Sequence, residues 1–348
     1  MNPYQYQPAR AFWRPAVAEA DPRTVDALWT PKFVLGQDDP IVTAGSCFAA
    51  RLGRPLIDHG RNWFNAEPAP PGLTPEERKA RRFGEFSFRT GNIYTAAVLR
   101  QWLSWAFDRA DVPTEVWEHD GRYYDPYRPA IEPDGFSSPA ELFEARSVTL
   151  AAIRDAVTEA RWFIFTLGLT EAWLDTTDET TYPACPGTVR GTFDPRRHAF
   201  HNYTFAEVHR DLTAALDIAR AANPELRFVL TVSPVPLTAT ATDDHILAAN
   251  GYSKSVLRGV AGQFAQECDD VDYFPSYELI TGAPFRSGFY APNLREVTPE
   301  GVEFVLRHFL SALTGQVAAT GPARTASGTP TTGGDVCEDA VLDYYGPR

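Results

Sequence analysis

The hydrophobic residues of this chain fall into short apolar runs separated by longer stretches with helical spacing. The clearest run is WFIFTL at 162–167, which ends at Gly168, and such continuous runs are typical of strands buried on both faces. Between the runs, apolar residues recur three or four positions apart, which predicts amphipathic helices. The pattern predicts strands at 41–44, 62–65, 162–167, 228–232 and 271–274, and helices over about 47–59, 139–160, 204–222, 250–267 and 298–313, with another from about Tyr94.

Strands that alternate with helices predict an α/β fold with a mainly parallel sheet covered on both faces. Residues 1–40 show no sustained period, and we expect them to form an arm packed on an α/β domain over 41–314. We expect three insertions in that domain to form a cap over the strand ends, at about 66–90, 110–140 and 175–203.

The remaining segment, 315–348, has a different composition. It begins with the low-complexity stretch GQVAATGPARTASGTPTTGG, which predicts a flexible tail. It ends with the acidic stretch DVCEDAVLDYYGPR, which is either a docking peptide for a protein partner or a solvated tail.

Two local signals predict further elements inside the insertions. Asp120-Gly121 lies between aromatic and β-branched flanks in VWEHDGRYYDPY, which predicts a tight β-hairpin. Thr74-Pro75-Glu76 predicts the start of a short helix, with threonine as the cap and proline in the first turn.

Composition narrows the possible partners. The formal net charge of −13 disfavours nucleic-acid binding, because an acidic surface repels phosphate backbones. No apolar run reaches the length of about 18 residues needed to span a membrane. The four cysteines are scattered without a C-x-x-C pair, which predicts a reduced, cytoplasmic protein.

The first predicted strand ends in two candidate nucleophiles, Ser46 and Cys47. Ser46 would lie at a helix N-terminus, where free N–H groups favour the oxyanion formed when a serine attacks an ester. The same position lowers the pKa of a thiol, so Cys47 is a competing nucleophile or a small packing residue. A third interpretation is a tight turn that uses Gly45 for its geometry and Ser46 as a helix cap.

Residues 44–49, AGSCFA, contain the signature for which the GSCFA family is named. The chain resembles that family over roughly 40–312, through GNIY at 91–94, TLG at 166–168, TVSPV at 231–235 and YFPSYE at 273–278. The GSCFA family is in turn similar to the SGNH/GDSL hydrolases, which are mostly esterases, lipases and carbohydrate O-acetyltransferases or deacetylases. The resemblance implies a three-layer α/β/α flavodoxin-like fold with a mainly parallel five-stranded sheet, and it places Ser46 at the nucleophile position.

The resemblance also implies an oxyanion hole. The backbone N–H groups of Ser46 and Gly91 match its donors, and Asn92 offers an amide beside them. The third SGNH block, Gly-x-Asn-Asp, falls on 168–171, where Thr170 replaces the asparagine and Glu171 the aspartate. The hydroxyl of Thr170 can donate a hydrogen bond, but with a shorter reach.

The last SGNH block departs from the pattern. Its Asp-x-x-His falls on 293–296, where this chain has Asn293 and Glu296. Without a base, attack by a serine is slow at neutral pH. His245 follows the fourth strand and has adjacent carboxylates, so it is the candidate base, with a surface-loop histidine as the alternative. Glu296 could act as a weaker base if burial raised its pKa.

Two further charged residues are candidates for binding a polar substrate. Glu171 follows the third strand, and Lys254 lies near the fourth and fifth, although a helix surface is the commoner place for such a lysine. His198 and His201 have the spacing of metal ligands, but only the distant Cys185 could complete such a site. The sequence therefore predicts no metal and no cofactor.

These features predict a serine-dependent acyl-ester hydrolase or O-acyltransferase that acts on a carbohydrate or a small polar acylated substrate. GSCFA relatives are often linked with polysaccharide biosynthesis, which favours the same class by resemblance. The alternative is a catalytically impaired, SGNH-like binding or scaffold module in polysaccharide or metabolite biosynthesis, because the Asp-x-x-His base is missing. A mechanism based on Cys47 is a third hypothesis.

Overall fold

The computed structural model describes residues 2–314, which divide into two compact units. One unit comprises residues 36–273, and the other combines residues 2–35 with residues 274–314. The domain predicted over 41–314 therefore includes parts of both units, and the predicted tail at 315–348 lies outside the described residues. Within residues 2–314, no helix has both the length and the apolar character needed to cross a bilayer.

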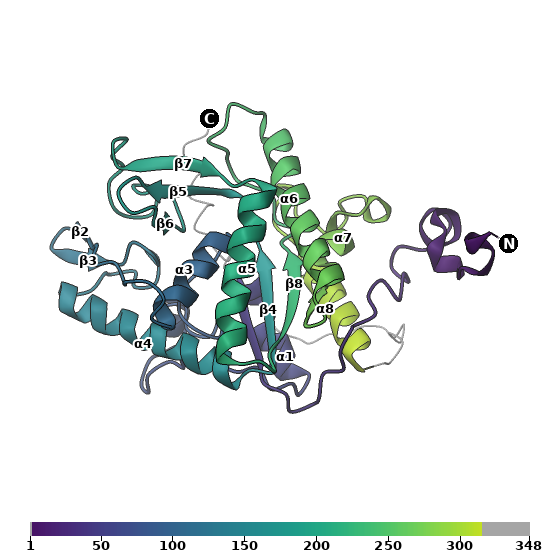
Figure 1. The fold of residues 1–348 in the computed structure, drawn as a ribbon, viewed down its shortest axis with the longest axis horizontal. Helices are drawn as coiled ribbons and strands as arrows, with labels where there is room; N and C mark the ends of the chain where they lie inside the picture. Colours follow the sequence, from purple (N-terminus) through teal and green to yellow (C-terminus); the bar gives the residue numbers. More distant parts are fainter. Residues whose placement is uncertain (1, 315–348) are drawn as a thin grey trace. The chain divides into compact units, whose positions relative to one another are not determined.

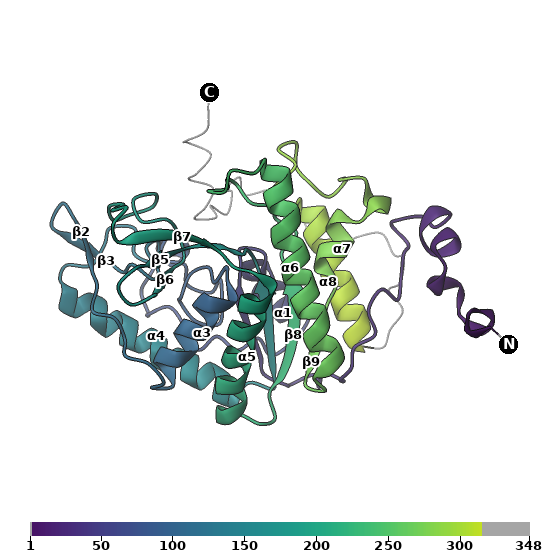
Figure 2. The same cartoon turned by 45° about the horizontal axis from the view of Figure 1, so that its top comes forward.

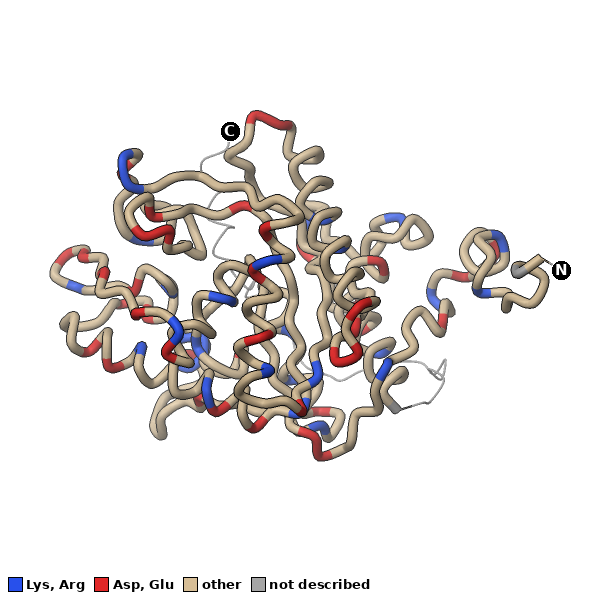
Figure 3. Tube along the Cα trace, viewed as in Figure 1, with Lys and Arg blue, Asp and Glu red and all other residues tan. Residues whose placement is uncertain are grey.

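A four-stranded parallel sheet forms the centre of the larger unit (Figure 1). Its strand order is β1-β4-β8-β9, and every neighbouring pair is parallel, as the alternation of strands and helices predicts. β1 and β4 carry no charged residue, whereas Lys, Arg, Asp and Glu gather mainly on helices and loops (Figure 3). The strands are β1 (Ile41–Gly45), β4 (Trp162–Leu167), β8 (Arg227–Val232) and β9 (Val271–Tyr273).

The second predicted strand, at 62–65, is reduced to a single bridge between Ile41 and Trp63. The indole N–H of Trp63 donates to Thr43 Oγ1 at 2.9 Å, and its ring lies against Gly53, where an added Cβ would come within 2.7 Å. The prediction of five strands is therefore wrong for this sheet, because the tryptophan side chain is anchored by packing after one ladder position.

Four long helices of this unit follow the predicted pattern. α3 packs on α5, α5 packs on α6, and α6 packs on β8 and β9 (Figures 1 and 2). A side chain caps each N-terminus by accepting a backbone N–H bond, and α6 begins four residues earlier than predicted because His245 provides its cap. The bounds are α3 (Ala96–Ala106), α4 (Pro139–Glu159), α5 (Phe205–Ala222) and α6 (Ile246–Glu267).

The helix predicted at 47–59 is much shorter in the structure. A 3-10 turn, η4 (Ala49–Arg51), precedes α1 (Gly53–Asp58), so the α-helix starts seven residues after Ser46. Gly53 and Pro55 explain the late start, since glycine is a poor helix former and proline lacks an N–H for the ladder. Ser46 therefore lies in a turn and not at the N-terminus of an α-helix.

The predicted insertions contain ordered elements. The hairpin of β2 (Trp117–His119) and β3 (Arg122–Tyr124) confirms the Asp120-Gly121 signal, and both turn residues have positive φ. The short helix α2 (Pro75–Ala80) begins at the predicted Thr74 cap. The sequence did not predict a three-stranded antiparallel sheet, β6-β5-β7, formed by β5 (Glu171–Asp175), β6 (Thr181–Tyr182) and β7 (His198–Asn202).

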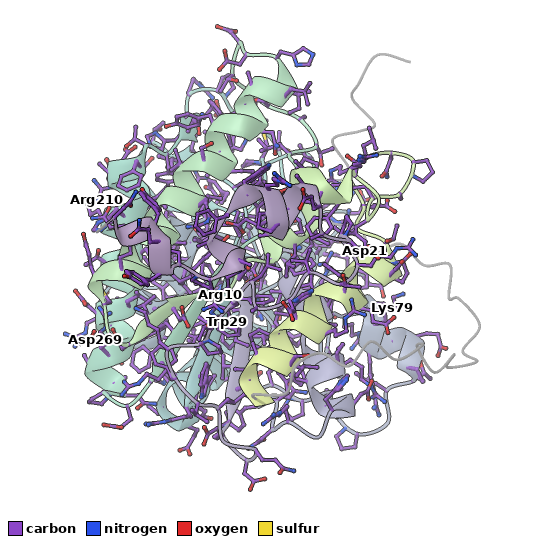
Figure 4. All side chains as sticks on the ribbon, turned by 90° about the vertical axis from the view of Figure 1, so that its right-hand side faces the viewer. Arg10, Asp21, Trp29, Lys79, Arg210 and Asp269 are labelled. Carbon is purple, nitrogen blue, oxygen red and sulfur yellow. The ribbon has the colours of Figure 1, made fainter. Side chains whose placement is uncertain are left out.

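Within residues 2–35 and 274–314, the smaller unit holds two α-helices, four shorter helical turns and an aromatic cluster. Trp29, labelled in Figure 4, stacks on Phe309 with ring centroids 5.5 Å apart, and it meets Phe274 edge-on at 5.1 Å. Its helical segments are η1 (Pro3–Tyr6), η2 (Ala9–Ala11), η3 (Arg14–Ala18), α7 (Ser276–Thr281), η5 (Ala283–Phe285) and α8 (Pro299–Thr314).

A buried ionic cluster joins the β2–β3 hairpin region to α4. Asp125 is 1% exposed and accepts hydrogen bonds from Arg128 at 2.9 Å and Arg146 at 2.8 Å, both of which are also buried. Burial opposes the ionisation of Asp125, but the two guanidinium groups outweigh it and lower the pKa of that carboxyl. The two arginines thus depend on one carboxylate for charge compensation in the interior.

We expect Asp125→Asn to lower the free energy of unfolding by about 3–5 kcal/mol, because it leaves two buried arginines without their counter-charge. Because the pKa of folded Asp125 lies below its unfolded value, this stabilisation is present above about pH 4 and is lost as the pH falls through the folded pKa. Urea denaturation at pH 7 and at decreasing pH measures both effects.

The control is Asp58→Asn, which removes an exposed i,i+4 ion pair with Arg54. That pair should contribute no more than about 0.5 kcal/mol. Equal losses for the two variants would contradict the role assigned to Asp125.

Candidate active site

The candidate site lies at the C-terminal ends of β1 and β4, beside the loop that precedes α3. Gly45 pairs with Thr166 in the parallel register, and the Ile93 N–H donates to the Gly45 carbonyl at 2.8 Å. The N–H groups of Gly168 and Leu169 both donate to the Tyr94 carbonyl. Three segments that are far apart in the sequence, 45–46, 91–94 and 166–169, therefore meet at one edge of the sheet.

Gly45 makes the closest of these approaches possible. Its φ of +131° is a conformation that L side chains rarely adopt, and an added Cβ would lie 2.4 Å from the Thr166 carbonyl oxygen. The adjacent Ser46 N–H donates to that same oxygen at 3.0 Å. Glycine is therefore required at position 45 by both backbone conformation and space.

Ser46 is buried, with 1% of its surface exposed, and its hydroxyl has no hydrogen-bond partner among the described residues. The Nδ2 amide of Asn92 is likewise buried and unpaired within residues 2–314. Buried polar groups are normally hydrogen-bonded, so an unpaired hydroxyl and an unpaired amide donor on two adjacent segments are unusual. This arrangement suits a ligand that accepts from the amide and contacts the hydroxyl.

Some of the predicted oxyanion donors are already hydrogen-bonded within the protein, and others are not. The Ser46 N–H already donates to Thr166, so in this conformation it is occupied. Thr170 is fully buried, and its hydroxyl donates to Asn202 Oδ1 at 2.7 Å, so it has a structural role. Gly91 has a φ of +69°, and its N–H makes no hydrogen bond to the described residues. Gly91 and Asn92 are therefore the donors that remain available.

The candidate bases are not hydrogen-bonded to Ser46. His245 is exposed, and its ring Nδ1 accepts the Leu247 N–H at 3.2 Å as the cap of α6. Glu296 belongs to the smaller unit, where it is exposed and follows a turn in which Asn293 Oδ1 accepts the N–H groups of Arg295 and Glu296. Residues 293–296, which stand in place of the Asp-x-x-His block, thus form a local turn.

Lys254, a predicted substrate-binding residue, is buried beside the site and does not lie on a helix surface, which was the alternative. It is 2% exposed, and its Nζ donates to the Gly168 carbonyl at 2.8 Å. A Cβ added to Gly168 would lie 3.0 Å from Ser46 Cβ, so Gly168 lies beside both the lysine amine and the serine side chain. The preceding residue, Ser253, accepts the Thr170 N–H at 3.0 Å, and α6 therefore holds the 168–170 segment at two points.

A cavity of about 190 Å³ adjoins this edge of the sheet. Glu171 lies on its wall, where the Thr240 hydroxyl and the Ala241 N–H donate to its carboxylate at 2.6 and 3.2 Å. Burial raises the pKa of Glu171, and these two hydrogen bonds offset part of the effect. The structure thus places Glu171 on the wall of a cavity.

The cavity is bounded by residues that the sequence did not indicate. They come from the loop before α3, the antiparallel sheet and the loop between β8 and α6, and they include Tyr94, Trp173, Tyr182 and Leu237. In the sequence, the strand β5 is indicated only by the alternation of polar and apolar residues from Glu171 to Trp173, which is too short to predict a strand. Among residues 2–314, no cluster of His, Cys, Asp or Glu is arranged to hold a metal ion.

The loop that carries Gly91 and Asn92 is fixed by the buried ionic cluster. Glu67 Oε2 accepts the Arg89 N–H at 2.9 Å, and Arg128 Nη1 donates to the Arg89 carbonyl at 3.2 Å. Thr149 bonds to both Glu67 and Arg128, which closes the network. The backbone two residues before Gly91 is therefore held by buried charges.

Gly45→Ala should lower the free energy of unfolding by at least about 3 kcal/mol or prevent folding, because backbone strain and a backbone clash add together. Gly60→Ala is the matched control, since Gly60 also has a positive φ, +68°, but has open space around it. We expect that control to cost about 1 kcal/mol. Chemical denaturation compares the two, and similar losses would contradict the close approach.

Ser46→Ala should leave the free energy of unfolding unchanged or raise it by up to about 1 kcal/mol, because it removes a buried hydroxyl without a partner. Thr43→Val, on the preceding strand β1, should lower it by about 1–3 kcal/mol, since Thr43 Oγ1 accepts the Trp63 indole N–H. Thermal and urea unfolding test both variants, and a clear destabilisation by Ser46→Ala would show that its hydroxyl is paired.

Comparison with known proteins adds one positive finding. A protein-family model described as the GSCFA family matches residues 40–309. A search of curated proteins finds no match to the chain.

Proposed function

The chain belongs to the GSCFA family, and on that premise we propose that it is a serine-dependent acyl-ester hydrolase or O-acyltransferase of SGNH-like architecture. The observation that carries the proposal is the pair of buried, unpaired groups Ser46 Oγ, just after β1, and Asn92 Nδ2, in the adjacent loop before α3. A carbohydrate or a small polar acylated molecule is the proposed substrate.

In this mechanism Ser46 Oγ attacks the ester carbonyl carbon, and its proton passes to a base. The carbonyl oxygen becomes an oxyanion that accepts from Asn92 Nδ2 and the Gly91 N–H, both of which are available. The tetrahedral intermediate expels the alcohol, which takes up a proton. Water or an acceptor hydroxyl then attacks the acyl-serine, and this choice distinguishes a hydrolase from a transferase.

Two side chains compete for the role of base. His245 is the candidate from the sequence, although its ring caps α6 and is exposed. Lys254 is buried beside Gly168, and lysine serves as the base of serine in some hydrolases.

Labelling with a fluorophosphonate probe tests the proposal. We expect labelling of the wild-type chain that is abolished by Ser46→Ala and slowed by about 10²–10³-fold by Asn92→Ala, because an oxyanion donor is lost. Ser147→Ala, an exposed serine on α4, is the control and should label normally. Labelling that persists in Ser46→Ala and is blocked by iodoacetamide would identify Cys47, and not Ser46, as the nucleophile.

The base is identified in the same experiment with two variants. His245→Asn removes the imidazole but keeps a capping side chain for α6, and Lys254→Met removes the amine but keeps an apolar stem. The variant that slows labelling, and that removes its dependence on pH, marks the base.

A binding or scaffold module is the second candidate function. It is favoured by one observation: within residues 2–314 no base is hydrogen-bonded to the Ser46 hydroxyl. A folded wild-type chain that no fluorophosphonate labels, at any pH at which it is stable, would establish this alternative over the enzyme.

A further inference from the structure

We propose that the cavity between the antiparallel sheet and the loop before α6 binds an alkylated ammonium group, of the size of choline. The cavity has a volume of about 190 Å³, and its walls come from 169–173, 182–188 and 237–241, together with Tyr94. An apolar cavity of about 150 Å³ holds benzene, so this one suits a group of about six to eight non-hydrogen atoms.

A negative charge on the wall points to a cationic ligand. Glu171 is the acidic residue among the lining side chains, and within the described residues no Lys, Arg or His forms an ion pair with it. Burying a carboxylate without a counter-charge is unfavourable, which agrees with the raised pKa of Glu171. A ligand cation would compensate this charge, and the carboxylate oxygens still have lone pairs to offer.

The position of this carboxylate is fixed before any ligand arrives. Thr240 Oγ1 and the Ala241 N–H hold its two oxygens, and Thr240 is itself paired with Thr242. The Cys185 thiol on the same wall does not add a second anion, because burial raises its pKa to about 11. Glu171 thus presents a preorganised single charge to the cavity.

The remaining walls select the kind of cation. Tyr94 and Trp173 supply aromatic rings, which attract ammonium groups. Leu169 and Leu237 add apolar surface that cannot replace the water around a metal ion or a primary ammonium. A carboxylate combined with aromatic and aliphatic walls therefore favours a weakly hydrated, alkylated ammonium.

The cavity adjoins the surroundings of Ser46, because Tyr94 and Leu169 line it and Gly168 lies beside both Tyr94 and Ser46. A Cβ added to Gly168 would meet Ser46 Cβ at 3.0 Å and the Tyr94 ring at 3.2 Å, and Tyr94 and Leu169 both line the cavity. An ester with an alkylated ammonium in its acyl or alcohol part is therefore the substrate class that fits both features. This assignment of a substrate rests on the proposed function, whereas the binding of ammonium does not.

Calorimetric titration of the full chain carrying Ser46→Ala tests the site without interference from turnover. The probes are choline and 3,3-dimethyl-1-butanol, which have the same shape and differ in charge. We expect choline to bind at least about tenfold more tightly, since cation–π and charge interactions of about 1.4 kcal/mol or more correspond to that ratio.

Glu171→Gln should weaken choline binding and leave binding of the neutral alcohol unchanged, because it removes the charge and keeps the shape and the aromatic walls. Glu179→Gln, an exposed glutamate on the turn between β5 and β6, should leave choline binding unchanged and controls for net charge. Equal affinities for the two probes, no saturable choline binding, or full binding by Glu171→Gln would overturn the proposal.

The outcome can be separated from that of the proposed function. Choline binding in a chain that no fluorophosphonate labels supports the cavity and contradicts the esterase. Labelling of Ser46 in a chain that does not bind choline supports the esterase and contradicts the cavity assignment.

Discussion

The contact between the end of β1 and the end of β4 is the constraint on which the rest of the site depends. Gly45 comes so close to Thr166 that no side chain fits, and the Ser46 N–H is then fixed to the Thr166 carbonyl. This bond orders the serine backbone, and it also removes that N–H from the set of oxyanion donors. The proposed donors are consequently Gly91 and Asn92, on a loop that a separate set of contacts must hold in place.

Those contacts come from buried charged side chains, which lose hydration when the chain folds. Asp125, Arg128 and Glu67 are buried, and together they hold the backbone before Gly91. A buried ionic network is weak as a source of stability, because desolvation opposes the Coulomb attraction, but it is specific in geometry. We infer that its contribution here is to fix the position of the loop, and that the stability of the unit comes mainly from its apolar sheet.

The antiparallel sheet β6-β5-β7 gives the site its second component, a cavity with a charge on its wall. Glu171 lies at the start of β5, and the loop between β8 and α6 orients its carboxylate through Thr240. Aromatic side chains of β5 and β6 complete the walls. The proposed nucleophile and the proposed ammonium site are thus connected through the 168–171 segment, which belongs to both.

The sequence by itself determined the elements that local patterns encode: the parallel α/β alternation, the Asp120-Gly121 hairpin, the Thr74 cap and the helices at 139–160 and 204–222. It also determined the family, because the Gly45-Ser46-Cys47 signature is contiguous. Only the tertiary structure decided which donors near Ser46 are free, that Lys254 is buried, that the strand at 62–65 shrinks to one bridge and that 171–202 forms a sheet. These outcomes depend on contacts between residues far apart in the chain, such as Trp63 with Thr43 and Thr170 with Asn202. Short-range periodicity carries no information about such pairs, since each is selected by packing and hydrogen-bond satisfaction in the folded chain.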